Sequence, residues 1–518
     1  MKRLLKNASK VSGLTMVSRV FGLVRDQLFA AMIGAGFFAD CFVIAFRIPN
    51  LLRDLFAEGA LSNAFVPTLT KTIYQDSPKQ GLVMVSKLMG LIIFVVGTII
   101  VLGILFAPQI VHMIAPGFSA IAGKVDQTAE LARILFPFLL FVSLGAVLMG
   151  IHHAHQSFTY PSIAPLMFNA ASIAGGLVIH FGGYTGKTAV MIWSVGTLCG
   201  GFLQFAIQAP PLLRAKKIPL PSFKKILANR RVREMMILMG PAIIALSGAQ
   251  INILVNTILA SLLEEGAPSW LNYGFRLMQL PIGIFGVAIG VVALAQASKD
   301  VSANDNALFH RNIEHAMNLN WLLTMPCAVG LWVMAQPIVA LLFERGAFTA
   351  FDTEMTAKAI QFYALGLPFY AGVKVKGPIF FTRNLARIPM VASLTGIAIN
   401  ILFNVLMYKK LGHWGLALGT SIGMLMNFLL LSIYFNRKFT PPQISSSVLF
   451  FFKVIIISVL MGVLTHQISH QVFTDPAPTE IYKILHVIVT IACAMVGYVV
   501  LVKAFGIWGL LKQVLKKD

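Results

Sequence analysis

The stretch LVMVSKLMGLIIFVVGTIIVLGILFAPQIVHM, residues 82–113, decides the class of fold. Lys87 is its one Lys, Arg, Asp or Glu side chain, and the rest is rich in Leu, Ile, Val, Phe and Met. Crossing ~30 Å of hydrocarbon takes ~20 apolar helical residues. Because the run is continuous and does not alternate with a period of two, it favours a helix over a β-barrel strand. It therefore predicts a transmembrane helix.

Similar apolar runs recur along the whole chain. Of 518 residues, 57% are hydrophobic and only 12% are charged, whereas a soluble domain is about 25% charged. We therefore expect an all-α integral membrane protein with about fourteen transmembrane helices. The runs lie near residues 14–34, 41–69, 82–113, 134–151, 162–181, 188–213, 235–262, 270–297, 313–342, 359–382, 388–407, 413–435, 447–468 and 482–508.

Lys and Arg residues are distributed unequally between alternate connections. The N-terminal segment, the connection at 214–233 and the C-terminal segment are rich in them. The positive-inside rule then places both termini in the cytoplasm. We attribute the net charge of +22 to this topology and to attraction to anionic lipid, so we expect no nucleic-acid partner.

The chain matches itself weakly at an offset near 228 residues. AFRIPNLL (45–52) corresponds to GFRLMQLP (274–281), and APQIVHMIAPGF (107–118) corresponds to AQPIVALLFERGAF (335–348). A repeat of six spans predicts two parallel six-helix lobes around a central cavity, an architecture typical of carriers. The predicted divisions are an N-terminal lobe at 1–213 (spans 1–6), a basic cytoplasmic linker at 214–234, a C-terminal lobe at 235–437 (spans 7–12) and an appendage of two further spans at 438–518.

The first two spans carry charges at membrane depth. SRVFGLVRDQLFAAMIGAG (18–36) contains Arg19, Arg25 and Asp26, each of which costs ~2.5–3.5 kcal/mol at the centre of a bilayer unless it faces a wet cavity or a partner. We expect Pro49 to interrupt the second span, since it lacks an N–H. Deep cations outnumber deep carboxylates, which predicts an anionic cargo, with phosphate as a good match for guanidinium groups. The cations are Arg19, Arg25, Arg47, Arg53, Arg276, Lys374 and Lys376, and the carboxylates are Asp26, Asp40, Asp54 and Glu58.

Three segments resemble the MurJ/MviN family of lipid II flippases, within the multidrug/oligosaccharidyl-lipid/polysaccharide exporter superfamily. They are SRVFGLVRDQLFAAMIGAGFFADCFVIAFRIPNLLRDLFAEGALSNAFVP (18–67), FRLMQLPIGIFGVAIG (275–290) and FERGAFTAFDT (343–353). The resemblance implies that the chain flips undecaprenyl-pyrophosphate-linked peptidoglycan precursor, lipid II, from the inner to the outer leaflet of the bacterial inner membrane by alternating access. Membrane lipids and proteins of cell-wall synthesis are then candidate partners, and the last two spans a candidate groove for the lipid tail.

The same resemblance implies a set of site residues. The family's cavity cations match Arg19, Arg25, Arg53, Arg276 and Lys374, which we expect to bind substrate. We expect supporting or coupling roles for Asp26, Asp40, Arg47 and Glu58. The chain departs from the family at Phe275 and Gln279, where many relatives carry acidic residues beside the arginine of the eighth span.

Other functions fit these residues less well. GGYTGKT (182–188) lacks the first glycine of a phosphate loop, and HHAH (152–155) has no acidic or Cys partner nearby, so we expect no ATP hydrolysis, metal site or cofactor. A membrane glycosyltransferase or lipid phosphatase would need a cluster of catalytic side chains near a membrane face, so we expect a transporter and not an enzyme. An exporter of another polyprenyl-linked glycan or a multidrug exporter remains the alternative.

Overall fold

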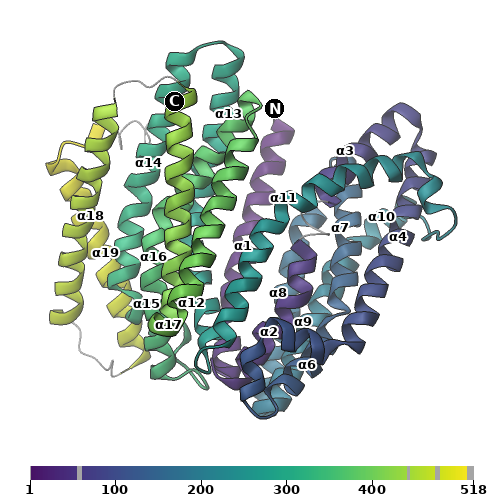
Figure 1. Ribbon diagram of the computed structural model, residues 1–518, viewed down its shortest axis with the longest axis horizontal. Coiled ribbons are helices and arrows are strands. Elements are labelled where there is room, and N and C mark those ends of the chain that lie inside the picture. Colours follow the sequence, from purple (N-terminus) through teal and green to yellow (C-terminus); the bar gives the residue numbers. More distant parts are fainter. Residues whose placement is uncertain (1, 55–60, 440–443, 473–478, 510–518) are drawn as a thin grey trace. The chain divides into compact units, whose positions relative to one another are not determined.

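The computed structural model describes residues 2–54, 61–439, 444–472 and 479–509. Within these ranges every regular element is a helix (Figure 1). The chain is therefore all-α, as its continuous apolar runs predict.

The helices form two compact units. Unit 1 comprises Met1–Pro268 with Arg345–Phe348, and unit 2 comprises Ser269–Glu344 with Thr349–Asp518. In unit 1 the helices are α1 (Lys2–Ile33), α2 (Phe37–Arg53), α3 (Ser62–Lys71), η2 (Thr72–Asp76), α4 (Pro78–Leu105), α5 (Ala107–Ile114), η3 (Pro116–Ala120), α6 (Lys124–Leu135), α7 (Phe138–Ala154), α8 (Thr159–Gly182), α9 (Gly186–Ala206), α10 (Ala209–Arg214), η4 (Ile226–Ala228) and α11 (Arg230–Ser261).

Unit 2 begins within α12 and contains the rest of the chain. Its helices are α12 (Ala267–Pro281), η5 (Ile282–Gly286), α13 (Val287–Ser302), α14 (Asn306–Val333), α15 (Ala335–Phe343), α16 (Ala350–Ile379), η6 (Phe380–Arg383), α17 (Arg387–Lys438), α18 (Ile444–Val472) and α19 (Glu480–Ala504). The two units are defined by which residues pack together, whereas the predicted lobes at 1–213 and 235–437 are defined by the sequence repeat. The lobe boundaries remain a prediction.

The predicted spans fall on helices wherever the structure describes them. Among the described residues, nine helices are long and apolar enough to cross a membrane. One of them, α17, joins two helices across a non-helical Gly412 (φ 63°, ψ −152°) and covers two predicted spans. The total of about fourteen spans remains a prediction.

Helix α4 has the burial pattern of a helix in contact with lipid. Met84, Leu88 and Val96, on one face of the helix, are buried, whereas Phe94 and Leu105 are 65% and 64% exposed. Apolar side chains thus cover both faces, which is favourable in a hydrocarbon solvent and costly in water. The helix starts at Pro78, after Ser77, whose hydroxyl accepts from the Gln80 N–H at 3.2 Å; this is a sound N-terminal cap.

The segment that follows α10 lies across α4. The Ser222 N–H donates to the Ser86 carbonyl oxygen at 3.0 Å, and the Ser86 hydroxyl donates to the Leu220 carbonyl oxygen at 2.6 Å. Lys87 Nζ donates to the Lys225 carbonyl oxygen at 3.2 Å. Gly90 allows this close approach, because a Cβ at that position would lie 2.2 Å from the Ser222 oxygen.

Replacing Gly90 by alanine is therefore expected to destabilise the protein by ~1–3 kcal/mol, because the linker backbone must move away from α4. Gly97, on the same helix, has no atom within 4 Å of the place that a Cβ would take. Gly97→Ala is the matched control and should be neutral or stabilising by ~0.5–1 kcal/mol. Denaturant unfolding of the purified protein in detergent measures both. Equal effects of the two substitutions would contradict the close contact.

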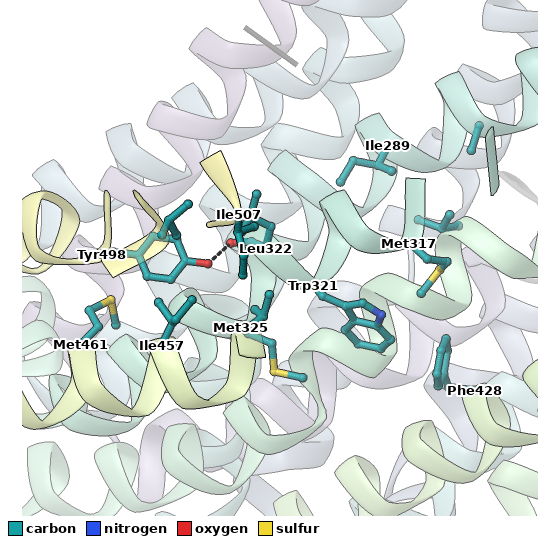
Figure 2. Packing of buried hydrophobic residues seen from close by; sticks show 14 residues of the cluster. Ile289, Met317, Trp321, Leu322, Met325, Phe428, Ile457, Met461, Tyr498 and Ile507 are labelled. Atoms are coloured by element: carbon teal, nitrogen blue, oxygen red, sulfur yellow. Dashed lines mark hydrogen bonds between the residues drawn. The ribbon is translucent and has the colours of Figure 1, made fainter. Parts of the chain in front are cut away.

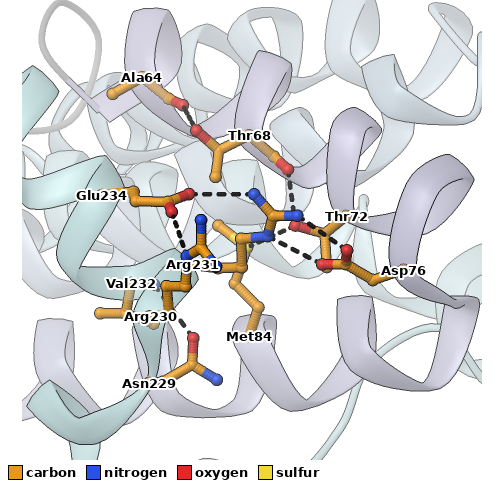
Figure 3. A network of polar contacts seen from close by, with 10 residues as sticks. All are labelled: Ala64, Thr68, Thr72, Asp76, Met84, Asn229, Arg230, Arg231, Val232 and Glu234. Carbon is orange, nitrogen blue, oxygen red and sulfur yellow. Dashed lines mark hydrogen bonds and ion pairs between the residues drawn. The ribbon is translucent and has the colours of Figure 1, made fainter.

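Ion pairs join the start of α11 to the end of η2 (Figure 3). The Arg231 guanidinium donates to both Asp76 carboxylate oxygens, at 2.8 Å each, and to Glu234 Oε2 at 3.0 Å. The hydrogen bond from Arg231 lowers the pKa of the Asp76 carboxyl. Hydrogen bonds from Arg230 and then Arg231 lower the pKa of Glu234.

This network predicts a pH-dependent contribution to stability. A carboxyl whose pKa is lowered by folding stabilises the folded state above its unfolded pKa of about 4, and this contribution disappears as the pH falls through the folded pKa. Asp76→Asn should therefore lower the unfolding midpoint at neutral pH, with the difference from wild type shrinking below about pH 4. Glu354→Gln, in an exposed pair with Lys358, is the control and should change the midpoint little. If Asp76→Asn lowered the unfolding midpoint by the same amount at every pH, the prediction would be contradicted.

In unit 2, α18 and α19 pack against α14 through a buried apolar cluster (Figure 2). Trp321, Met325, Ile457 and Val502 belong to this cluster. The Tyr498 hydroxyl donates to the Leu322 carbonyl oxygen at 2.7 Å, so its polar atom is satisfied within the apolar surroundings. These two helices, the predicted appendage, are thus held to unit 2 by a core that they share with α14 and its neighbours.

Candidate functional site

Arg25 on α1 is held in place by two neighbours. Its Nε and Nη2 donate to Asp26 Oδ1 at 3.1 and 2.8 Å, and its Nη1 donates to Asn169 Oδ1 on α8 at 2.9 Å. The Asn169 amide in turn donates to the Ser18 carbonyl oxygen at 3.0 Å. These contacts fix the guanidinium plane, and α1 packs along α8.

The surroundings of Arg25 are partly shielded from solvent. The side chains of Arg25 and Asp26 are 16% and 17% exposed, and the Arg25 guanidinium carbon lies 5.4 Å from the centre of the Phe168 ring. Charge-assisted hydrogen bonds are strong in such an environment. Arg19, nearly two helical turns earlier on α1, is exposed, so the structure does not bring it into this cluster.

Arg53, at the end of α2, makes a similar local pair. Its Nε and Nη2 donate to Asp54 Oδ1 at 3.2 and 3.0 Å.

The expected interruption at Pro49 is wrong, because α2 continues through Pro49 to Arg53. Pro49 removes one backbone donor, which a transmembrane helix tolerates. Arg47 is half-buried on the same helix, and Glu58 lies outside the described residues.

Asp40 forms a buried ion pair that joins three segments of unit 1. Lys124 Nζ, at the start of α6, donates to Asp40 Oδ2 at 2.9 Å, and both side chains are almost fully buried. The backbone N–H of Gly266, in the turn after α11, also donates to Asp40 Oδ2, at 2.8 Å. Glu265 Oε2 lies 3.8 Å from Lys124 Nζ, and the amine sits 4.5 Å from the centre of the Phe118 ring. A buried carboxylate requires such partners.

The end of α1 lies close to another segment of the same unit. The Ala347 N–H donates to the Ala31 carbonyl oxygen at 2.8 Å. Gly34 has φ +79°, and a Cβ there would lie 2.5 Å from the Ala347 oxygen, so both the backbone conformation and the contact require glycine. The segment 345–348 thus packs against unit 1, although α15 and α16 on either side of it belong to unit 2.

The remaining predicted cations lie in unit 2. Arg276 is half-buried on α12, and Lys374 is exposed on α16; Lys374 Nζ lies 5.7 Å from the centre of the Tyr370 ring. Lys376 Nζ donates to the Ser432 hydroxyl of α17 at 2.9 Å and lies 4.9 Å from the centre of the Phe428 ring. The convergence of these cations with Arg25 and Arg53 on one cavity remains a prediction.

Two residues that matter for this site do not stand out in the sequence. Lys124 falls in a predicted connection on the non-cytoplasmic side, and its pairing with Asp40 is seen only in the structure. The signal that could have found it is a deep aspartate in a span, which requires a cation from somewhere in the fold. Asn169 carries no such signal, because one amide in an apolar span has many explanations.

These contacts are suited to binding an anion. A guanidinium held on one edge by a carboxylate or an amide presents its fork in a fixed orientation, which matches the oxygens of a phosphate. In the described parts of the chain, no group of three or more His, Cys, Asp or Glu side chains is placed to hold a metal ion.

Comparisons with known proteins identify the family. The family model described as lipid II flippase MurJ matches residues 29–487. The lipid II flippase MurJ of Burkholderia cenocepacia is 33% identical over 432 residues, which is 83% of each chain. A relative from Buchnera aphidicola with the same family name is 32% identical over 505 residues, covering 97% of this chain and 98% of that one.

Solved structures of similar fold include a member of the same family. A lipid II flippase MurJ in an inward closed conformation is similar with a TM-score of 0.80 and 25% identity, covering 95% of this chain and 99% of that chain. An inward-facing multidrug resistance transporter of the MATE family shares the fold, with a TM-score of 0.69 and 13% identity, covering 84% of this chain and 98% of that chain. From the family match and the curated relatives we conclude that this chain belongs to the MurJ family of lipid II flippases.

Proposed function

We propose that this chain flips lipid II, the undecaprenyl-pyrophosphate-linked peptidoglycan precursor, from the inner to the outer leaflet of the bacterial inner membrane. The observation that carries this proposal is the family match over residues 29–487. Membership of a flippase family makes the chain a transporter and not an enzyme. The lipid substrate and the surrounding membrane lipids are its partners, and proteins of cell-wall synthesis are further candidates; we propose no role in binding nucleic acid.

The diphosphate of lipid II would be bound by Arg19, Arg25, Arg53, Arg276 and Lys374. Arg25 and Arg53 have the contacts that favour this role, because each guanidinium is oriented by a neighbouring carboxylate. Asp26 then acts by positioning Arg25, since a carboxylate facing an anionic cargo would repel it. Asp40 would have a supporting role, because its carboxylate holds Lys124 and the turn at Gly266 in place. We assign Arg47 and Glu58 to supporting positions on the resemblance of their segment alone.

Transport would proceed by alternating access between the lobes at 1–213 and 235–437. Two contacts within unit 1 that join segments of the two predicted lobes favour this: Asp40 with Gly266, and Ala31 with Ala347. Both termini would be cytoplasmic, according to the distribution of Lys and Arg. The 214–234 linker would then lie at the inner surface, and the appendage at 438–518 would bind the lipid tail.

The test is a leaflet-accessibility assay for lipid II in cells whose own flippases are depleted. Cells that express this chain should expose lipid II at the outer leaflet at the normal rate, whereas cells with an empty vector should accumulate it inside. An outer-leaflet rate that does not depend on the chain would contradict the proposal. The alternative cargo, another polyprenyl-linked glycan, is tested by following that lipid in the same cells.

A further inference from the structure

A basic cavity lies at one end of unit 2, apart from the residues proposed to bind lipid II. It has a volume of about 450 Å³ and is open to the surface. Its lining comes from the first turns of α14, from η6 and from the end of α17. The lining residues are Asn306, Ala307, His310, Arg311, Glu314, Arg383, Lys438 and Phe439.

The charges that line this cavity are unbalanced. Arg311, Arg383 and Lys438 supply three cations, against the one carboxylate of Glu314. Asp305 lies just before α14 and accepts from the Leu308 N–H at 2.8 Å, so its carboxylate caps that helix. His310 adds a titratable group. The cavity therefore suits an anion.

Arg383 is oriented by its contacts. It donates a hydrogen bond to Asn306 Oδ1. Its guanidinium carbon lies 5.3 Å from the centre of the Phe309 ring and 5.6 Å from that of the Phe439 ring. Arg383 is exposed to solvent, but the hydrogen bond and the two nearby rings restrict the orientations of its planar fork. A fixed fork is the arrangement that binds phosphate oxygens well.

The position of the cavity indicates the source of the phosphate. Asn306 begins one helix that is long and apolar enough to cross a membrane, and Lys438 ends another. In the proposed topology, the cavity therefore lies where these spans leave the hydrocarbon, which is the level of lipid headgroups. Phe309, Phe380 and Phe435 belong to a buried apolar cluster that also contains Phe439 of the lining.

From these observations we infer that this cavity binds the phosphate headgroup of an anionic phospholipid. The proposed topology places that lipid in the inner leaflet. None of the lining residues is among those proposed to bind lipid II, and the bound lipid would anchor the start of α14 and the end of α17 to the membrane surface.

The experiment measures lipid retention by the purified full-length chain with native mass spectrometry. Phosphatidylglycerol and phosphatidylethanolamine are compared, because both carry phosphate but only the first has a net negative charge. Each cation near an anionic headgroup changes affinity about fivefold. The double variant Arg311→Ala with Arg383→Ala should therefore bind phosphatidylglycerol roughly 25-fold more weakly and bind phosphatidylethanolamine almost as before.

The matched control removes two exposed cations elsewhere, Arg214→Ala with Lys224→Ala, and should retain phosphatidylglycerol like wild type. Arg383→Lys keeps the charge but loses the planar fork, so it should bind with intermediate affinity. Equal losses in the two double variants would overturn the proposal, because they would indicate general attraction to a basic protein. Displacement of the lipid by inorganic phosphate at equal concentration would also overturn it, since the site would then recognise a soluble anion.

Discussion

Replacing Arg25 by alanine is expected to reduce the rate of lipid II flipping roughly 100-fold or more. A hydrogen bond between charged groups contributes ~1.5–3 kcal/mol, and a guanidinium can make two of them with one phosphate. The substitution also removes the partner that Asp26 and Asn169 share, so a carboxylate is then exposed to the anionic cargo. Arg25→Lys keeps the charge without the fork and should recover only part of the rate.

The measurement is complementation of flippase-depleted cells, together with the amount of protein in the membrane. Arg214→Ala, which removes an exposed arginine at the end of α10, is the control and should support normal growth. Normal growth with Arg25→Ala at normal protein levels would remove Arg25 from the substrate site. Asp26→Asn should be milder than Arg25→Ala if Asp26 acts by positioning. The opposite order would indicate that Asp26 carries a proton.

Replacing Lys124 by methionine is expected to destabilise the protein by ~3–5 kcal/mol. The substitution leaves the buried carboxylate of Asp40 without its cation, and a buried ion pair broken on one side costs about that much. The Gly266 N–H remains a hydrogen-bond donor to Asp40, but a neutral donor does not balance a full charge.

A double substitution tests this explanation. Asp40→Asn with Lys124→Met removes both charges and keeps an oxygen to accept from Gly266, so most of the lost stability should return. Lys187→Met breaks an exposed pair with Glu130 and should cost ~0–1 kcal/mol. Denaturant unfolding in detergent compares these variants with the wild-type chain. A double variant less stable than Lys124→Met would contradict the assignment of a buried pair.

The class of fold could be predicted from the sequence because membrane helices are determined by local composition. Residues 82–113 and the other apolar runs are long enough to cross a bilayer whatever they pack against. Pro49 shows the limit of local rules. A proline removes one hydrogen bond, but whether the helix ends there depends on packing around α2, and in this chain the helix continues.

The candidate site was predictable in part for the same reason. Charges such as Arg25 and Asp26 stand out because they are costly in hydrocarbon, and their pairing is local. The pairing of Asp40 with Lys124 joins residues 84 positions apart, and no periodicity in one sequence encodes it. Lys124 resembles a loop residue because its own segment is polar, and only tertiary packing buries it.

Reconstitution of the purified chain provides the most direct test of its proposed activity. Vesicles are prepared with lipid II confined to one leaflet, and its appearance in the other leaflet is followed with and without the protein. We predict transfer that depends on the chain and that falls roughly 100-fold with Arg25→Ala. Transfer at the same rate in vesicles with the wild-type chain, with Arg25→Ala and without protein would contradict the account.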